Sequence, residues 1–199
     1  MKIKVICVWG SYRCRGNTEF LINFLKDELV KYGAHVEIFN LCNMNIEPCR
    51  ACWMCIDKKG FCSIKDDMTK ILIPKIIVAD ALVVGSPVYF NNVSACVKKF
   101  IDRTWCLKGL LRNKIGGAIV VGRGYGAELA LAAIHAFMLK HEMILGFRGV
   151  TGFAFRKGEI KKDSEALMLV RRLAKRIIEL AEATTELRKK YNENVFLIK

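Results

Sequence analysis

Short apolar runs alternate with longer stretches of helical periodicity along the chain. The short runs are rich in β-branched residues, which predicts strands. The longer stretches place apolar residues three or four positions apart, as Phe20, Phe24 and Leu25 do, which predicts helices. The expected strands cover residues 2–9, 36–41, 81–86, 115–122 and 150–155. The expected helices cover residues 17–32, 66–77, 93–103, 127–141 and 163–187.

Strands separated by helices predict a parallel sheet that is covered on both faces. The run 81–86 is apolar throughout, as in a strand buried on both sides. Five such units predict an α/β, flavodoxin-like three-layer fold with strand order 2-1-3-4-5 and a ligand at the carboxyl ends of the strands. We expect one domain over residues 1–199, with a cysteine-rich insertion at 42–65 after the second strand and a tail at 188–199.

Length and composition limit the possible classes of protein. More than half of the 199 residues are apolar, which is enough for one substantial core. No apolar stretch reaches the roughly 18 residues of a membrane span, and no secretory signal begins the chain, so we expect a cytoplasmic protein that binds no membrane. The net charge of +14 favours acidic partners or anionic ligands. The basic residues are scattered, which is typical of solvated surfaces and does not establish nucleic-acid binding.

A polar loop follows the first expected strand and leads into a helix. Residues 10–18 read GSYRCRGNT, with donor groups on Ser11, Arg13, Asn17 and Thr18. Backbone N–H groups and the helix dipole make such a turn suitable for a phosphate monoester. The alternative is that Asn17 or Thr18 only caps the helix.

A second segment follows the third expected strand. Residues 85–95 read GSPVYFNNVSA, where Pro87 fixes the backbone and Tyr89 and Phe90 offer flat apolar area for an aromatic ring system. Core aromatics followed by an ordinary helix cap are the alternative.

A third loop, residues 122–126, contains three glycines. It fits a relaxed dinucleotide fingerprint, but Glu142 ends a helix instead of a strand, so we reject that interpretation.

Four of the nine cysteines lie within fourteen positions, at Cys49, Cys52, Cys55 and Cys62. An odd number of cysteines without a signal peptide argues against a disulfide framework. Three thiols separated by two residues resemble the ferredoxin arrangement, whereas structural zinc sites use two pairs separated by a longer hairpin. The spacing favours a cubane cluster, and zinc or redox-active thiols stay as alternatives.

The three loops and the cysteines together resemble known families. Residues 10–18 resemble the GSxRxxGNT phosphate loop, and residues 86–103 resemble the SPVYFxNVSAxxKxFIDR signature, of the NADPH-dependent FMN reductase and iron-sulfur flavoprotein families. Tyr12 stands where proline is common in the phosphate loop. The motif C-x2-C-x2-C-x6-C falls within the compact pattern of iron-sulfur flavoproteins, to which the chain is similar over nearly its whole length.

The resemblance implies two cofactors, FMN and a [4Fe–4S] cluster. It implies that Cys49, Cys52, Cys55 and Cys62 hold the cluster. It implies that FMN is bound by Ser11, Arg13, Gly16, Asn17, Thr18, Pro87, Val88, Tyr89, Phe90, Asn91, Gly122, Gly124, Tyr125 and Gly126. It further implies a homodimer or homotetramer that moves electrons between flavin and cluster and exchanges them with ferredoxin or a similar acidic carrier, with NAD(P)H as a further candidate donor.

Two other classes of function stay open. The first is an NAD(P)H-dependent FMN or quinone reductase whose cysteines bind zinc or nothing. The second is a nucleic-acid-binding module, which only the charge suggests. No Ser-His-Asp or paired-carboxylate arrangement is apparent, so we expect flavin redox chemistry without a catalytic side chain. The apolar run 195–198 near the C-terminus predicts packing across a subunit boundary, with packing on its own domain as the alternative.

Overall fold

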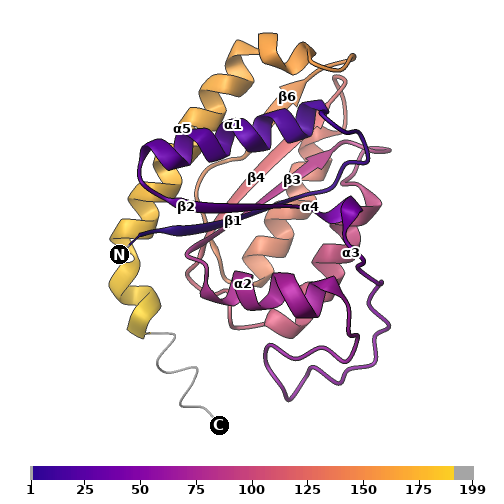
Figure 1. Ribbon diagram of the computed structural model, residues 1–199, viewed down its shortest axis with the longest axis vertical. Coiled ribbons are helices and arrows are strands. Elements are labelled where there is room, and N and C mark those ends of the chain that lie inside the picture. The colour runs from indigo at the N-terminus through magenta and orange to yellow at the C-terminus, as the bar shows by residue number, and fades with distance from the viewer. Residues whose placement is uncertain (1, 191–199) are drawn as a thin grey trace.

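A parallel sheet forms the centre of the protein, and helices cover both of its faces (Figure 1). The computed structural model describes residues 2–190. The strands are β1 (Lys4–Trp9), β2 (His35–Asn40), β3 (Ala81–Pro87), β4 (Ile115–Gly122), β5 (Ile144–Leu145) and β6 (Val150–Phe153). Their order is β2-β1-β3-β4-β5, with β6 also paired to β4, so the predicted flavodoxin-like order is confirmed.

The edge of the sheet beside β4 differs from the single strand that we expected. β5 pairs with the start of β4, and β6 pairs with its end. Between them lies Gly149, whose φ of +97° is accessible mainly to glycine. The fifth position in the sheet is therefore filled by two short strands with a glycine turn between them.

Helices cover both faces of the sheet, with a pair on one face and a second group on the other (Figure 1). The first pair is α1 (Asn17–Lys31) and α5 (Ser164–Ala183), and the second group is α2 (Ile73–Val78), α3 (Ala95–Arg103) and α4 (Ala127–Lys140). Each layer packs its own apolar cluster against the sheet. The helix expected at 66–77 begins as a π-helical turn, Met68–Leu72, which continues directly into α2, and Pro74 lies in the first turn of α2.

The C-terminal part of the chain follows the expected long helix. Asp163 caps α5 by accepting a hydrogen bond from the Ala166 N–H at 2.9 Å. Arg188, beyond α5, pairs with Asp80 at the start of β3, with 3.0 Å between Nη2 and Oδ1. The apolar run 195–198 and most of the expected tail lie outside the described residues. Within residues 2–190, no helix has the length and apolar character needed to cross a bilayer.

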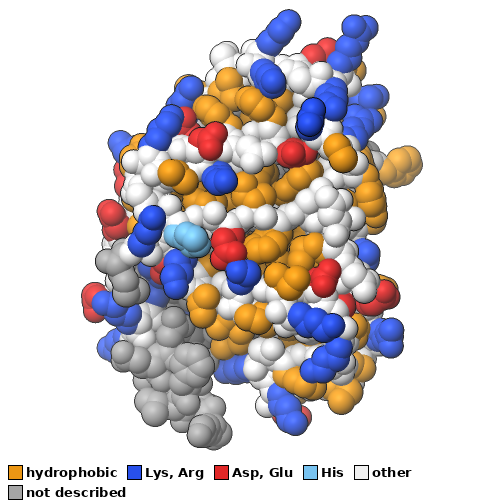
Figure 2. All heavy atoms as spheres, viewed as in Figure 1, with side chains coloured by type: hydrophobic (Ala, Val, Ile, Leu, Met, Phe, Trp, Pro, Cys, Tyr) orange, Lys and Arg blue, Asp and Glu red, His pale blue; other side chains and the backbone are white. Residues whose placement is uncertain are grey.

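Basic side chains are spread over the surface. Figure 2 shows Lys and Arg at the top, the sides and the bottom of the face in view, with acidic side chains between them. Several cations pack against aromatic rings, as Lys161 does over Phe20 and Arg171 over Phe24. This distribution on the visible face resembles a solvated surface more than a single basic groove for nucleic acid.

Candidate functional site

A cavity of about 410 Å³ opens at the carboxyl ends of β1, β3 and β4. It is lined by all the residues predicted to bind FMN except Asn91, Gly124 and Gly126. Four further lining residues were not indicated by the sequence: Val121, Arg123, Ala154 and Lys157. The three predicted loops therefore meet at one site, where the fold class places its ligand.

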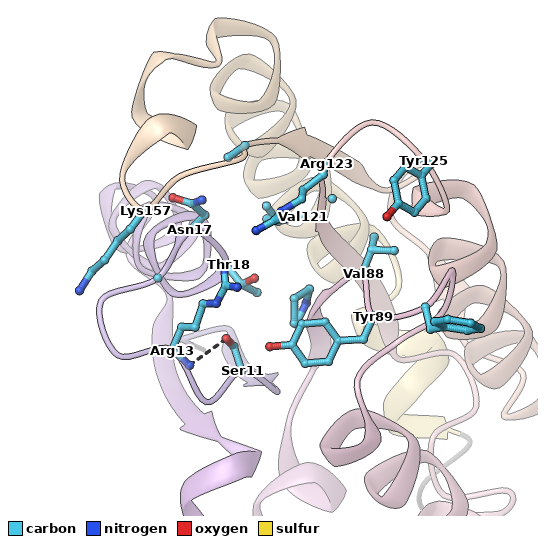
Figure 3. Close-up of a pocket in the computed structure, with 15 residues that line it drawn as sticks. Ser11, Arg13, Asn17, Thr18, Val88, Tyr89, Val121, Arg123, Tyr125 and Lys157 are labelled. Atoms are coloured by element: carbon cyan, nitrogen blue, oxygen red, sulfur yellow. Dashed lines mark hydrogen bonds between the residues drawn. The ribbon is translucent and has the colours of Figure 1, made fainter.

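The start of α1 forms one end of this cavity. Gly16 precedes the helix in an extended conformation, and no side chain caps the first turn. The loop before it is ordered by Ser11, whose buried Oγ accepts a hydrogen bond from the Arg13 N–H at 3.2 Å (Figure 3). An uncapped helix N-terminus offers N–H groups and a positive dipole end to an anion.

Three cations come from three different loops around the same space (Figure 3). Arg13 belongs to the phosphate loop, Arg123 follows β4, and Lys157 follows β6. The sequence assigned only Arg13 to the ligand. Arg123 lies within the predicted loop 122–126, whereas Lys157 lies in a segment that no motif indicated. Arg13 and Arg123 beside a helix N-terminus fit a dianionic phosphate group, whereas the Lys157 ammonium points away from both of them in Figure 3.

Asn17 has a different role from the anion donor that we expected. Its Nδ2 donates to the Arg156 carbonyl oxygen at 2.9 Å, and its Oδ1 accepts from the Gly158 N–H at 2.8 Å. Both ends of the amide are therefore engaged with the backbone on either side of Lys157. Asn17 holds this segment against the phosphate loop.

A tight turn places the aromatic residues that follow β3. Tyr89 and Asn92 pair through two backbone hydrogen bonds of 2.9 and 3.1 Å. Between them, Phe90 and Asn91 have φ of 48° and 64°, a left-handed conformation that costs roughly 1 kcal/mol or more per non-glycine residue. The Phe90 side chain is fully exposed at the cavity. Such strain is typical of functional loops.

Asn91 and Gly126 do not line the cavity but contact each other next to residues that do. Gly126 has φ of +72°, and a Cβ there would lie 2.6 Å from the Asn91 Oδ1 atom. Only glycine therefore lets the loop after β4 approach the turn after β3 so closely. These two residues shape the cavity without lining it.

Helix α3 starts beside this cavity. Ser94 caps it, since its Oγ accepts from the Val97 N–H at 3.4 Å. The same hydroxyl donates to the Gly10 carbonyl oxygen at 2.7 Å, and the Ser94 N–H donates to Ser86 Oγ at 2.9 Å. One buried serine thus ties the phosphate loop, the end of β3 and α3 together.

The other end of α3 reaches a second cavity, of about 310 Å³. All four predicted cluster ligands, Cys49, Cys52, Cys55 and Cys62, line it. They come from the long segment between β2 and α2, which extends away from the sheet (Figure 1). Ala51 and Trp53 have φ of 49° and 59°, so the backbone turns sharply between successive cysteines.

The cysteines differ in their surroundings. A hydrogen bond between Ser63 Oγ and Cys52 Sγ, 3.3 Å apart, lowers the pKa of the Cys52 thiol, and a backbone N–H adds to this effect. Burial raises the pKa of the Cys55 thiol. Because iron binds thiolates, the ready ionisation of Cys52 suits it to a ligand role.

The spacing of these side chains bears on which metal group they suit. In the part of the chain that the structure describes, no three His, Cys, Asp or Glu side chains are close enough to share a single metal ion. In a cubane each cysteine binds a different iron, so its thiolates lie farther apart than the ligands of one ion. The four thiols line one cavity, so a single metal group bound there would be within reach of all of them.

The second cavity is also lined by Arg103, Trp105 and Cys106, which the sequence did not assign to it. Trp105 lies edge to face with Trp53, with 6.2 Å between ring centroids. Burial raises the pKa of Cys106 to about 12, which keeps this fifth thiol protonated. Arg103 and Cys106 lie more than forty positions after Cys62, and no local spacing indicated their contact with the cysteine segment.

Comparison with known proteins places these features in a family. The model of the NADPH-dependent FMN reductase family matches residues 1–155. An iron-sulfur flavoprotein of Methanocaldococcus jannaschii is 38% identical over 90% of this chain and 98% of its own length. One of Archaeoglobus fulgidus is 36% identical over 94% of this chain and 99% of its own length.

Solved structures agree in fold at low sequence identity. RosB with a bound 8-demethyl-8-formylriboflavin-5'-phosphate intermediate superposes with a TM-score of 0.74 at 18% identity, over 92% of this chain and 81% of RosB. An archaeal flavodoxin superposes with a TM-score of 0.60 at 16% identity, over 90% of this chain and 99% of the flavodoxin. These likenesses establish the flavodoxin-like fold.

Proposed function

The chain belongs to the iron-sulfur flavoproteins within the NADPH-dependent FMN reductase family, and we propose that it transfers electrons between FMN and a [4Fe–4S] cluster. One observation carries the proposal: the four closely spaced cysteines wall a single cavity, at the opposite end of α3 from a cavity built by the three flavin-type loops.

The residues of the first cavity suit the two ends of FMN. The uncapped start of α1 and the Arg13 side chain would bind the phosphate. Tyr89, Phe90 and Tyr125 would lie beside the isoalloxazine ring, and Gly122 lets the backbone approach it closely. The side chains of this chain thus bind and orient the flavin, and Val88 and Val121 exclude water from one side of it.

Bound FMN exchanges one or two electrons, and a cubane exchanges one at a time, so together they would link two-electron and one-electron donors. The cysteine loop would hold the cluster through Cys49, Cys52, Cys55 and Cys62. Ser63 favours the thiolate of Cys52, and Trp53 and Trp105 shield part of the cavity.

We propose ferredoxin or a similar acidic carrier as the external partner. Arg50, Lys58, Lys59 and Lys65 are exposed on or beside the cysteine loop, where they would attract an acidic surface.

We also propose a homodimer or homotetramer. Exposed apolar side chains on the same loop, Trp53, Met54 and Ile56, support association, because such a group is costly to leave in water.

A second candidate function is that of an NAD(P)H-dependent FMN or quinone reductase without a working cluster. It is favoured by a relative named NAD(P)H dehydrogenase (quinone) from Chromohalobacter salexigens, which is 29% identical over 70% of this chain. The two functions differ in what the cysteine loop carries.

The deciding experiment is purification without oxygen, followed by an absorption spectrum and quantification of FMN, iron and acid-labile sulfide. We expect one FMN and about four irons and four sulfides per chain. FMN with no iron or sulfide, together with rapid oxidation of NAD(P)H, would support the reductase instead.

A further inference from the structure

Arg103, the last residue of α3, is a buried cation beside the cysteine cavity. Its side chain is only 1% exposed, and it makes a two-pronged ion pair with Asp66. Nη1 donates to Asp66 Oδ2 at 2.6 Å, and Nη2 donates to Oδ1 at 3.1 Å. The carboxylate therefore fixes the plane of the guanidinium.

The same guanidinium closes the base of the cysteine loop. Nη1 also donates to the Glu47 carbonyl oxygen at 2.7 Å, just before Cys49. On the far side of the loop, Nη2 lies 3.4 Å from the Ile64 carbonyl oxygen, just after Cys62. One side chain thus joins both ends of the segment that carries the four cysteines.

Arg103 also contacts one of the predicted ligands directly. Its Nη2 donates to Cys62 Sγ at 3.5 Å. The Nε atom of Arg103 is buried and has no hydrogen-bond partner among the described residues. The oxygen acceptors around the guanidinium therefore do not use its Nε–H group. A purely structural ion pair would need neither a contact with the sulfur nor a place on the cavity wall.

Hydrogen bonds and positive charge near cluster sulfurs favour the reduced form, because reduction adds a negative charge. We propose that Arg103 is a positioning residue that orients Cys62 and raises the reduction potential of the cluster. This inference rests on the proposed function, in which Cys62 is a cluster ligand. Asp66 holds Arg103 in place, and α3 joins this contact to the flavin-type cavity at its other end.

The test compares Arg103→Lys and Arg103→Met with the wild type. The lysine variant leaves a cation beside Asp66 but removes the planar fork that reaches Cys62. Arg176→Met is the control, since Arg176 pairs with Glu179 on the exposed face of α5, on the other side of the sheet. Iron and sulfide content, the electron paramagnetic resonance spectrum of the reduced cluster, and the midpoint potentials of cluster and flavin are measured in each protein.

We expect the cluster potential to fall in Arg103→Lys and to fall further, with partial loss of iron, in Arg103→Met. The flavin potential should stay unchanged and serves as the internal reference. If Arg103→Met does not fold, the lysine variant decides alone. A wild-type potential and spectrum in Arg103→Lys would overturn this inference only, whereas wild-type protein without iron and sulfide would overturn the proposed function as well.

Discussion

The side-chain amide of Asn17 joins the start of α1 to the backbone of Arg156, with 2.9 Å between Nδ2 and the carbonyl oxygen. The other end of the amide accepts from the Gly158 N–H at 2.8 Å. This pair of hydrogen bonds places Lys157 beside the phosphate loop. The binding end of the cavity is thus assembled from segments about 140 residues apart in the sequence.

Replacing Asn17 by Ala should therefore weaken FMN binding by about tenfold. The substitution removes two neutral hydrogen bonds, each worth about 1 kcal/mol. Part of this free energy is lost from the ordering of the Lys157 segment, and the rest is lost from FMN binding. Fluorescence titration of the apoprotein with FMN measures the effect. Asn23→Ala is the matched control, because Asn23 donates to the Glu19 carbonyl oxygen within α1 and does not line the cavity. Equal affinities in the two variants would contradict the prediction.

Replacing Arg13 by Ala should weaken FMN binding at least about tenfold while leaving riboflavin binding nearly unchanged. A charge-assisted hydrogen bond to a phosphate is worth about 1.5 to 3 kcal/mol, and riboflavin has no phosphate. Arg15→Ala is the control, since Arg15 lies in the same loop but does not line the cavity. Equal losses of affinity for FMN and for riboflavin would show that Arg13 contacts the ring end of the flavin or affects folding, and does not bind the phosphate.

The features that the sequence revealed are those encoded within short segments. The glycine-rich and polar loops directly follow strands, and the cysteines are a few positions apart, so local spacing indicated both sites. Lys157 reaches the flavin-type cavity, and Arg103 reaches Cys62, only through tertiary packing. Likewise, the split of the fifth strand depends on a glycine turn that resembles any other loop in sequence.

Replacing Cys49, Cys52, Cys55 or Cys62 singly by Ser should remove most of the iron while leaving FMN bound. Each serine removes one thiolate from a cluster that needs four, whereas the flavin-type cavity contains none of these residues. Cys106→Ser should keep its iron, because the Cys106 thiol lies in the same cavity but is held protonated by burial, with its pKa raised to about 12. The iron and FMN contents per chain of each variant measure the loss of the cluster and the retention of the flavin. Full clusters in two or more of the four variants would refute the ligand assignment.

Acid should destabilise the protein through His141. The Thr104 hydroxyl donates to the Ile101 carbonyl oxygen at 2.6 Å, and its Oγ1 is hydrogen-bonded to His141 Nε2 at 3.0 Å. The other ring nitrogen is buried without a partner among residues 2–190. Burial accordingly lowers the pKa of His141 from 6.5 to about 4.

The unfolded chain takes up this proton near pH 6.5, whereas the folded protein resists it down to about pH 4. The unfolded state binds more protons in this window, so stability falls as the pH is lowered. Between pH 7 and pH 5 the loss should be about 2 kcal/mol. Urea unfolding followed by circular dichroism measures it, and His141→Gln should flatten the slope. An unchanged slope in His141→Gln would contradict the assignment.

The basic residues of the cysteine loop should steer the proposed acidic carrier toward it. Lys58 and Lys59 are exposed on the cysteine loop, and Lys58 lies over the Phe61 ring, with its Nζ 5.7 Å from the centroid. Such positions beside a cluster would attract an acidic partner before contact, which accelerates association mainly at low salt. Neutralising both as Lys58→Gln/Lys59→Gln should slow reduction of the cluster by ferredoxin several-fold.

The difference should shrink as salt is added, because the screening length falls from about 10 Å at 0.1 M to about 3 Å at 1 M. Lys175→Gln/Arg176→Gln removes the same charge from exposed positions on α5, across the sheet from the cysteine loop. Stopped-flow rates over a range of salt separate local steering from an effect of net charge. Equal slowing in both double variants would mean that only the overall charge of +14 matters. Unchanged rates in the loop variant would mean that the carrier docks elsewhere.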